Sequence, residues 1–292
     1  MKSRLEYLLL IGFSRLVCAL PLSAALTLGR AFGIFIGRVV RYRRKVALEN
    51  LRKAFGTEKD EAELRRILRG VYRHFGQMLV EFCRFPVLSG RRIERLVTME
   101  HPEILEEAAQ RGNGVVLVSG HFGNWEMMAA AIAHKGYPMR GLVANQRNTA
   151  VGDLMDRFRR SVQVEPIRVG VSVKDVLRAL SRGEIVAIIS DQNAGRRGVF
   201  VDFFGRPTST PQGAATIALK RDVPIVLGFS VRQPGGRHRV VLERFPHPDH
   251  FPDGSEGVRV ATQLYTERLE QYIRRYPEQW LWLHRRWKSS PG

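Results

Sequence analysis

His121 and Glu126 lie where a predicted buried strand, the apolar run 115–119, gives way to a predicted helix of small apolar residues. On an unbroken helix, side chains five residues apart point about 140° apart, but Gly120 and Gly123 let the chain turn tightly enough for the two to meet. A carboxylate beside a histidine fixes its tautomer and stabilises the imidazolium that forms when the ring takes a proton. The pattern therefore predicts His121 as a general base and Glu126 as its partner. The alternative is a packing histidine and a surface glutamate.

No covalent nucleophile or cofactor motif accompanies this pair. Ser119 has Leu117 and His121 where a Gly-x-Ser-x-Gly elbow requires glycines. The sequence contains no His-Glu-x-x-His, Cys-x-x-Cys or phosphate-loop motif, so we expect neither a metal nor a nucleotide cofactor. Base-assisted attack of an acceptor hydroxyl on an acyl donor is the simplest chemistry that remains.

The elements that must position these residues alternate between strand and helix from about residue 100 onward. We expect helices at 102–111, 124–135, 149–162, 172–182, 211–221 and 256–275, and strands at 115–119, 140–144, 185–190, 199–204, 224–231 and 238–244. Continuous apolar strands separated by helices indicate a sheet covered on both faces. The last two strands flank Pro234-Gly235-Gly236 and predict a hairpin. The fold class is therefore α/β, with a mixed, mostly parallel central sheet flanked by helices.

The N-terminal part of the chain has a different character. Residues 7–48 contain no Asp or Glu, and their apolar runs end in a basic cluster at 38–45. Arg15, Pro21 and Arg30 keep every run short of the roughly 20 residues of a simple transmembrane helix, and a cleavable signal peptide fits poorly. Apolar segments followed by a polybasic patch predict membrane association. The alternative is a pair of buried core helices.

We expect three parts. Residues 1–45 are a membrane-associating helical segment, 46–98 a helical lead-in and 99–292 the catalytic domain. In the lead-in, apolar residues recur at helical spacing from Asp60 to Phe85, where Pro86 ends the helix, and residues 88–95 are a linker. If one N-terminal helix spans a membrane, the basic cluster after it places the catalytic domain in the cytoplasm.

The net charge of +19, from 47 Lys and Arg against 28 Asp and Glu, points to a polyanionic partner. Nucleic acid, anionic lipid and an acidic carrier protein all fit that charge. A basic nucleic-acid-binding protein would explain the charge but not the acid-free apolar N-terminus, and no nucleic-acid-binding motif is present. The two cysteines form no disulfide framework.

Several blocks in order resemble one family. The stretch Gly120-His-Phe-Gly-Asn-Trp-Glu126 resembles the H-x-x-x-x-(D/E) motif of the lauroyl- and myristoyl-type lipid A biosynthesis acyltransferases, within the lysophospholipid acyltransferase superfamily. Further blocks similar to the family's are residues 43–55, Ser190-Asp-Gln192, 199–205 with Thr210-Pro211, and the ending 277–288. The resemblance implies a glycerolipid acyltransferase-like fold and an enzyme at the cytoplasmic face of a bacterial inner membrane.

The resemblance also implies residue roles. His121 would be the general base, Glu126 its partner and Asp191 the required aspartate, although a strand-end turn residue is the alternative for Asp191. Arg159 or Arg160 would contact substrate or donor, as would Arg147, which is displaced from the family's usual Arg-Pro. Asn124 and Gln192 are further candidates for substrate contact.

The donor implied by the resemblance is an acyl-acyl carrier protein or acyl-coenzyme A, with no other cofactor and no nucleic-acid partner. The acceptor would be a hydroxyl of a lipid A precursor or similar glycolipid. A phosphatidylinositol mannoside, an aminolipid or a lysophospholipid remains an alternative acceptor. The terminal His284-Arg285-Arg286, with Trp280, Trp282 and Trp287 around it, is either a solvated basic tail or an interfacial or structural lock.

Overall fold

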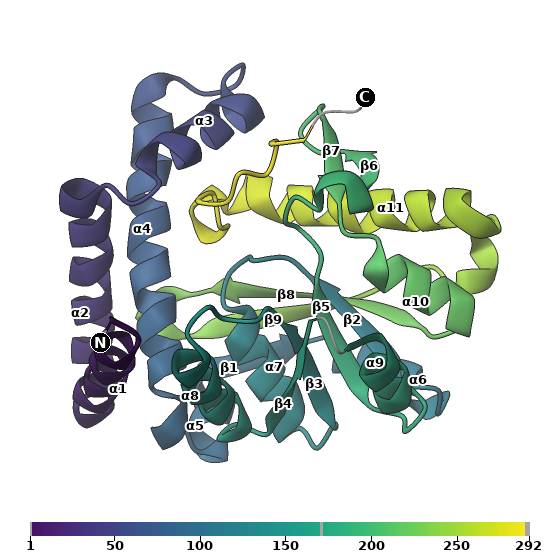
Figure 1. Cartoon of the computed structure of the whole chain (residues 1–292), viewed down its shortest axis with the longest axis horizontal. Coiled ribbons are helices and arrows are strands. Elements are labelled where there is room, and N and C mark those ends of the chain that lie inside the picture. Colours follow the sequence, from purple (N-terminus) through teal and green to yellow (C-terminus); the bar gives the residue numbers. More distant parts are fainter. Residues whose placement is uncertain (1, 170–171, 290–292) are drawn as a thin grey trace.

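A seven-stranded sheet forms the centre of the computed structural model, which describes residues 2–169 and 172–289 (Figure 1). The strand order is β1-β9-β8-β2-β5-β3-β4, and neighbours are parallel except for the antiparallel β8–β9 pair. The strands are β1 (Val97–Glu100), β2 (Val115–Ser119), β3 (Met139–Val143), β4 (Val164–Arg168), β5 (Ile185–Ile189), β8 (Ile225–Arg232) and β9 (His238–Arg244). A separate antiparallel pair contains β6 (Val199–Asp202) and β7 (Pro207–Thr210).

Helices cover both faces of this sheet (Figure 1). They are α1 (Lys2–Ala19), α2 (Leu22–Phe35), α3 (Arg44–Phe55), α4 (Glu61–Cys83), α5 (Gly90–Leu96), α6 (Pro102–Gln110), α7 (Trp125–His134), α8 (Thr149–Arg160), α9 (Ser172–Leu180), α10 (Gly213–Arg221) and α11 (Gly254–Arg275). All five residues of β2 are buried. Val116 and Val118 join a core with α9, α10 and α11, whereas Val115 and Leu117 join a core with α5 to α8. Burial on both faces explains the continuous apolar run of this strand.

The predicted fold class, a mixed and mostly parallel sheet flanked by helices, is confirmed. The hairpin across Pro234–Gly236 is also present, as β8 and β9. The sequence missed β1 and β4, which are the two edges of the sheet. Strand β4 reads Val-Glu-Pro-Ile-Arg and has no apolar run, and proline is tolerated on an edge strand. The predicted linker at 88–95 is largely helical, as α5.

Helix α2 packs closely along α4 through glycines (Figure 1). A Cβ at Gly33 would overlap the carbonyl oxygen of Tyr72, and a Cβ at Gly76 would overlap that of Gly29. The two backbones therefore touch, as they do in small-residue contacts between membrane helices. Helix α2 continues as the π-helical turn Ile36–Val40, and Leu22–Val40 is long and apolar enough to cross a membrane, with 28% of it buried.

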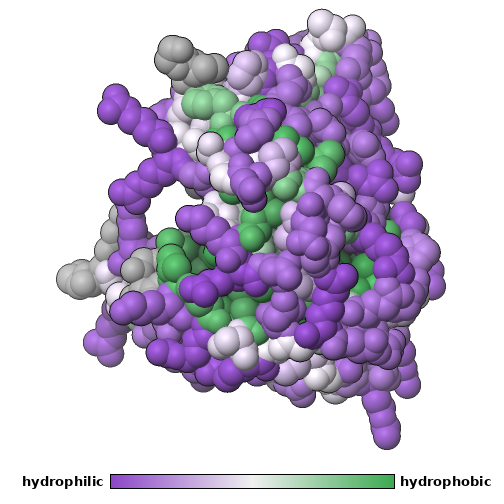
Figure 2. Space-filling model, turned by 90° about the vertical axis from the view of Figure 1, so that its right-hand side faces the viewer, coloured by the Kyte–Doolittle hydropathy of each residue, from purple (hydrophilic) through white to green (hydrophobic). Residues whose placement is uncertain are grey.

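The outward faces of α1 and α2 carry the main exposed apolar side chains. Exposed large apolar residues here are Leu5, Leu8, Leu9, Leu16, Phe32, Phe35, Val39, Val40 and Tyr42. Figure 2 views the opposite side of the molecule, where hydrophilic side chains dominate and hydrophobic ones show mainly in hollows between them. Most of the exposed large apolar residues thus gather at one end of the molecule.

Candidate active site

The turn after β2 carries His121. The hydroxyl of Ser119 donates a hydrogen bond to the carbonyl oxygen of Gly228 on β8 (2.6 Å), which fixes the end of the strand. A Cβ at Gly120 would lie 2.7 Å from the side chain of Leu269 and 3.0 Å from Oδ2 of Asp191, so a larger residue does not fit. His121 therefore leaves the sheet at the edge formed by the carboxyl ends of parallel strands, where ligands of α/β sheets bind.

Gly123 and Asn124 then turn the chain into α7. Gly123 has a φ of 58°, and a Cβ there would overlap the carbonyl oxygen of Ser230. Its N–H donates to the carbonyl oxygen of Gln279 (2.8 Å). Oδ1 of Asn124 accepts a hydrogen bond from the Met127 N–H (3.0 Å) and caps the helix. The position of His121 is thus fixed by contacts on both sides of it.

Asp191 is the partner of His121. Nδ1 of His121 lies 2.6 Å from Oδ1 of Asp191, and the backbone N–H of His121 donates to Oδ2 (2.7 Å). The indole N–H of Trp280 also donates to Oδ2 (2.7 Å). The sheet explains this meeting, because β2 and β5 are parallel neighbours with Ser119 opposite Ile189. His121 lies two residues after Ser119 and Asp191 two residues after Ile189, so both lie at the carboxyl ends of these neighbouring strands.

The surroundings keep the Asp191 carboxylate ionised. Burial alone would raise the pKa of Asp191, but the charge of His121 and the hydrogen bonds from His121 and Trp280 outweigh it and hold the pKa below its ordinary value. An ionised carboxylate takes the hydrogen bond from Nδ1–H of the imidazole, which leaves Nε2 with its lone pair. The side chain of His121 is 22% exposed, so Nε2 can accept a proton from a bound substrate.

Glu126 does not fill the role predicted for it. It lies in the first turn of α7, and its carboxylate binds Arg159 of α8 through two hydrogen bonds, from Nη2 (2.6 Å) and Nε (3.0 Å). Arg159 also reaches Asp156, 3.4 Å away, which in turn pairs with Arg168 at 2.7 Å. The predicted contact between Glu126 and His121 is therefore corrected. Glu126 lies five residues after His121, on the side of α7 that contacts α8. Asp191, which follows the neighbouring strand β5, is the carboxylate that contacts His121.

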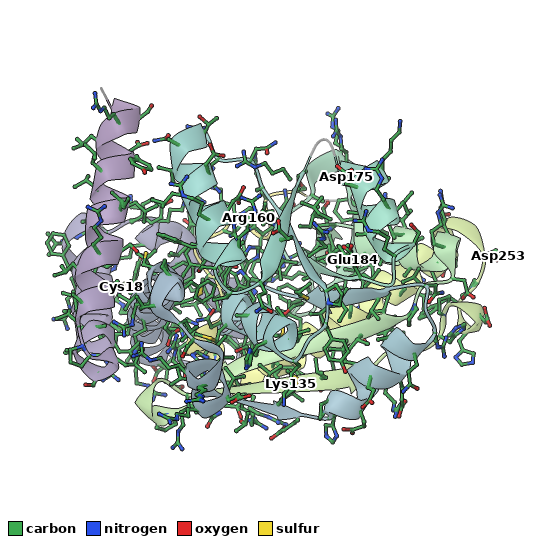
Figure 3. All side chains as sticks on the ribbon, turned by 90° about the horizontal axis from the view of Figure 1, so that it is seen from below. Cys18, Lys135, Arg160, Asp175, Glu184 and Asp253 are labelled. Atoms are coloured by element: carbon green, nitrogen blue, oxygen red, sulfur yellow. The ribbon has the colours of Figure 1, made fainter. Side chains whose placement is uncertain are left out.

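The structure separates the three candidate arginines. Arg159 is buried, and although burial would lower its pKa, the charge of Glu126 and the hydrogen bonds to it raise the pKa above its ordinary value. Arg160 is exposed at the end of α8 and pairs with Glu165 (Figure 3). Arg147 is exposed in the loop after β3. Of these three residues, only Arg159 binds the helix that follows His121, through Glu126 of α7.

Gln192 lies against the base, whereas Asn124 does not face outward. Nε2 of Gln192 is 3.4 Å from Nε2 of His121. Asn124 is fully buried, and its amide donates to Oε2 of Glu81 on α4 (2.6 Å). Both polar atoms of Asn124 thus have protein partners, and its place in the structure is that of a positioning residue.

A buried ionic cluster behind the loop went unnoticed in the sequence. Glu81 binds Arg232 of β8 through both guanidinium Nη atoms (2.6 and 2.5 Å) and also contacts His238 (3.2 Å). His74 of α4 lies 3.0 Å from the carbonyl oxygen of Gly123, and burial lowers its pKa to about 3, so it is neutral. The available signal was Glu81 itself, a lone acid among Met78, Leu79, Val80 and Phe82 on an otherwise apolar stretch.

The C-terminal segment after α11 also lines the site. Trp280 and Trp282 are buried, and the Leu281 N–H donates to the carbonyl oxygen of His121 (3.1 Å). The side chain of Arg286 is buried and donates to the carbonyl oxygen of Ser209 and the hydroxyl of Thr210 (both 2.6 Å). Of the two readings that the sequence left open for this segment, the structure favours a lock over a solvated tail.

Only one group of residues in the described part of the chain could hold a metal ion. Ligand atoms of Asp222, His247 and Asp249 lie within 4.8 Å of one another. Both aspartates are exposed. Asp222 precedes β8, so the group lies at the amino end of this strand, whereas His121 lies at the carboxyl end of its parallel neighbour β2. The group therefore takes no part in the chemistry of His121.

Known proteins resemble this chain over most of its length. The sequence model of the family described as bacterial lipid A biosynthesis acyltransferase matches residues 2–289, which confirms the resemblance drawn from the motifs. The lipid A biosynthesis lauroyltransferase of Escherichia coli (strain K12) is 26% identical over 284 residues, covering 96% of this chain and 90% of that protein. The phosphatidylinositol mannoside acyltransferase of Mycobacterium tuberculosis (strain ATCC 25618 / H37Rv) is 24% identical, covering 74% of this chain and 68% of that protein.

Among solved structures, the 1-acyl-sn-glycerophosphate (LPA) acyltransferase PlsC from Thermotoga maritima covers 93% of this chain and 98% of its own, with a TM-score of 0.40 and 14% sequence identity. That is a weak overall similarity. The fold described above rests on the strand order and packing of this chain alone.

Proposed function

Since the chain belongs to the bacterial lipid A biosynthesis acyltransferase family and is an acyltransferase, we propose that it moves a fatty acyl chain from a carrier-protein thioester to a hydroxyl of a lipid A precursor or a similar glycolipid. His121 is the general base of this reaction. The observation that carries the proposal is the hydrogen bond between Nδ1 of His121 and buried Asp191, which leaves Nε2 beside solvent.

In the first step, Nε2 of His121 takes the proton of the acceptor hydroxyl while the hydroxyl oxygen bonds to the thioester carbonyl carbon. The carbonyl electron pair moves onto oxygen and gives a tetrahedral oxyanion. Asp191 stabilises the imidazolium without taking its proton, because its carboxylate also holds hydrogen bonds from Trp280 and the His121 backbone.

In the second step, the oxyanion reforms the carbonyl and the carbon–sulfur bond breaks. The thiolate leaves and takes the proton from Nε2 of His121, which restores the neutral base and releases a thiol. The products are an ester on the acceptor and the free thiol of the carrier. No cofactor beyond the thioester donor enters this scheme.

Charge supports an acidic carrier as donor. The net charge of +19 includes basic residues at 38, 41, 43, 44 and 45, next to the exposed apolar residues of α2. A cationic surface attracts an acidic carrier protein and the phosphates of an anionic lipid, and arginine binds phosphate through paired hydrogen bonds. Acyl-coenzyme A, also an anion, is the other donor that this charge would attract.

Position supports a membrane surface. The exposed apolar side chains of α1 and α2, followed by basic residues, suit contact with an anionic bilayer, and the apolar helix Leu22–Val40 adds to this. We place the enzyme at the cytoplasmic face of the inner membrane, because acyl thioesters are made in the cytoplasm and the polybasic patch favours that side.

The test is an acyl-transfer assay with purified protein in detergent or vesicles. One acyl chain is presented as the carrier-protein thioester and as the coenzyme A thioester, each with a lipid A precursor, a phosphatidylinositol mannoside, an aminolipid or a lysophospholipid. Mass spectrometry identifies the acylated product. We expect the carrier-protein thioester and the lipid A precursor to give the fastest turnover. Absence of an acylated product in every combination would overturn the proposal.

A second candidate acceptor is a phosphatidylinositol mannoside, favoured by the 24% identity to an enzyme that bears this name. The base, its aspartate and the thioester chemistry are the same for both acceptors, so the site itself does not discriminate between them. Turnover with the mannoside and none with the lipid A precursor would select this candidate.

A further inference from the structure

His284 lies on the C-terminal segment that closes over the loop carrying His121. The segment contacts this loop at Gly123, through the carbonyl oxygen of Gln279 (2.8 Å), and at His121, through the N–H of Leu281 (3.1 Å). Three residues after Leu281, the carbonyl oxygen of His284 accepts a hydrogen bond from the amide of Asn50 on α3 (2.6 Å). The backbone of His284 is therefore fixed beside the site.

The tautomer of His284 follows from one contact. The backbone N–H of Asn193 donates to Nε2 of His284 (3.2 Å), so Nε2 serves as an acceptor and a neutral ring carries its proton on Nδ1. Burial lowers the pKa of His284, and nearby Arg286, Arg43 and His121 lower it further against the opposing effect of Asp191. At neutral pH the ring is uncharged and presents an Nδ1–H.

That Nδ1–H has no hydrogen-bond partner in residues 2–169 and 172–289. The side chain is only part-buried, and Nδ1 is not among the buried polar atoms that lack a partner, so it meets solvent. The His284 side chain lies near His121. Its hydrogen-bond partner, Asn193, directly follows Gln192, whose amide lies 3.4 Å from Nε2 of His121, and the charges of Asp191 and His121 both act on the pKa of His284. A fixed, neutral and unused donor thus stands near the reacting atoms.

We propose that the Nδ1–H of His284 donates a hydrogen bond to the thioester carbonyl oxygen as that oxygen becomes an oxyanion. The proposal rests on the acyl-transfer function proposed above. As the hydroxyl oxygen bonds to the carbonyl carbon, the carbonyl electron pair moves onto oxygen, and the donor stabilises the new charge. The proton stays on His284 throughout, and His121 carries out both proton transfers. A neutral histidine held as a donor keeps its N–H at every pH at which the base is active.

Three variants separate this role from a structural one. In His284→Gln the side-chain oxygen reaches the position of Nε2 and keeps the contact with the Asn193 N–H, but the donor at Nδ1 is lost. His284→Ala loses both. His250→Gln, at an exposed histidine of the 3₁₀ turn Pro248–His250, is the matched control.

We expect kcat of His284→Gln to fall about 10²-fold with KM for donor and acceptor unchanged, as for loss of one oxyanion donor. His284→Ala should lose at least as much and also melt at a lower temperature, and His250→Gln should match the wild type. Wild-type kcat in His284→Gln would overturn the proposal and leave His284 as a structural contact. A raised KM with unchanged kcat would also overturn it, because the contact would then belong to the ground state.

The tautomer can be measured without turnover. In protein labelled with ¹⁵N-histidine, the ¹H–¹⁵N correlations of His284, assigned by comparison with His284→Gln, should show the Nδ1–H form at pH 7. The Nε2–H form or an imidazolium would overturn the proposal. If wild-type protein acylates no acceptor, the proposed function fails and this proposal fails with it. If the wild type is active and turnover does not depend on His284, only the proposal for His284 fails.

Discussion

Asp191 shapes what His121 can do. Its carboxylate accepts hydrogen bonds from the His121 ring, the His121 backbone and the Trp280 indole. With all three in place, the imidazole can turn neither toward Glu126 nor out of the site. The base is therefore held in one orientation before any substrate binds, which lowers the cost of reaching the transition state.

Removal of the base alone is best achieved with His121→Asn. The asparagine amide N–H occupies the place of Nδ1 and keeps the hydrogen bond to Asp191, while the basic Nε2 disappears. We expect the rate of acyl transfer to fall about 10²–10⁴-fold and the melting temperature to stay near that of the wild type. The assay described above and thermal unfolding check this, and wild-type turnover would exclude His121 as the base.

Asp191→Asn tests the partner by activity and by pH. We expect acyl transfer to fall about 10²-fold or more, because the amide no longer stabilises the imidazolium. The folded-state pKa of Asp191 lies below its ordinary value of 3.8, so its ionised form stabilises the fold above that pH, and this stabilisation is lost as the pH falls through the folded-state pKa. The gap in unfolding free energy between wild type and Asp191→Asn should therefore narrow below about pH 4.

Asp175→Asn is the control for that pH series, since Asp175 is a partly exposed residue of α9 that pairs with Arg178 (Figure 3). The unfolding free energy of Asp175→Asn, plotted against pH, should run parallel to that of the wild type. Urea unfolding measures the difference in unfolding free energy between wild type and Asp191→Asn. If that difference is constant between pH 3 and 6, the lowered pKa of Asp191 is contradicted.

At the residue scale, the sequence predicted the important types but paired them wrongly. His121 and Asp191 both follow apolar strands, which the sequence predicted to end at residues 119 and 190. Their contact depends on β2 and β5 being neighbours in register, with Ser119 opposite Ile189, which a single sequence does not contain. Glu126 is closer to His121 along the chain than Asp191 is, so the sequence predicts Glu126 as the partner. The sequence assigned His284 no role of its own within the terminal segment, tail or lock, because its contact partner, Asn193, is distant in sequence.

At the scale of elements, α7 and α8 are joined by charge. Glu126 on α7 and Asp156 on α8 both contact Arg159, and the three side chains are largely buried. A buried arginine between two carboxylates holds the helix that starts just after His121. The motif glutamate thus supports the position of the helix and not the tautomer of the base.

Arg159→Ala and Arg160→Ala form a matched pair of neighbours. Loss of Arg159 leaves Glu126 buried without its partner and Asp156 with Arg168 alone, and we expect a loss of about 3–5 kcal/mol in unfolding free energy. Loss of Arg160, which forms an exposed pair with Glu165, should cost less than about 1 kcal/mol. Chemical unfolding of both variants measures the difference, and equal losses would refute the buried network.

Gly33 and Gly12 form a second pair, on α2 and α1. A methyl group at Gly33 would overlap the backbone of Tyr72, whereas one at Gly12 meets no atom within 4 Å. We expect Gly33→Ala to lower the unfolding free energy by about 1–3 kcal/mol, as overpacking does. Gly12→Ala should be neutral or stabilising, because alanine favours helix. Melting curves in detergent compare them, and a tolerated Gly33→Ala would mean that α2 is not seated on α4 as described.

The elements that the sequence predicted well are those buried on both sides. Strands β2, β5 and β8 lie in the middle of the sheet and read as continuous apolar runs. The edge strands β1 and β4 have one neighbour each and more polar sequences, so no period or run identified them. The short helix α5 has a single buried residue, Ile93, which is too little for a helical pattern.

At the scale of the whole molecule, the exposed apolar residues of α1 and α2 give the protein an apolar end, which we expect to face a membrane. Substituting Leu5→Glu and Leu9→Glu together should weaken binding to phosphatidylglycerol vesicles at least about 100-fold, since each inserted leucine contributes about 1.5–3 kcal/mol. Both side chains are more than half exposed, so the fold should tolerate the change. Co-sedimentation with vesicles measures the binding.

Leu264→Glu serves as the control, on α11 and 37% exposed. It should bind vesicles as the wild type does. Equal loss in both variants would point to a general effect of added negative charge, and unchanged binding of the Leu5 and Leu9 variant would place membrane contact elsewhere on the molecule.

The contacts of the C-terminal segment set an order of events during synthesis. His121 and Asp191 leave the ribosome well before residues 280 and 284. Until those residues emerge, the Asp191 carboxylate lacks the hydrogen bond from the Trp280 indole, and the C-terminal segment does not cover the loop that carries His121. A nascent chain that has exposed only residues up to α11 therefore holds the base and its aspartate but not a finished site. We therefore expect acyl transfer to begin only once the C-terminal segment has emerged and packed against the loop that carries His121.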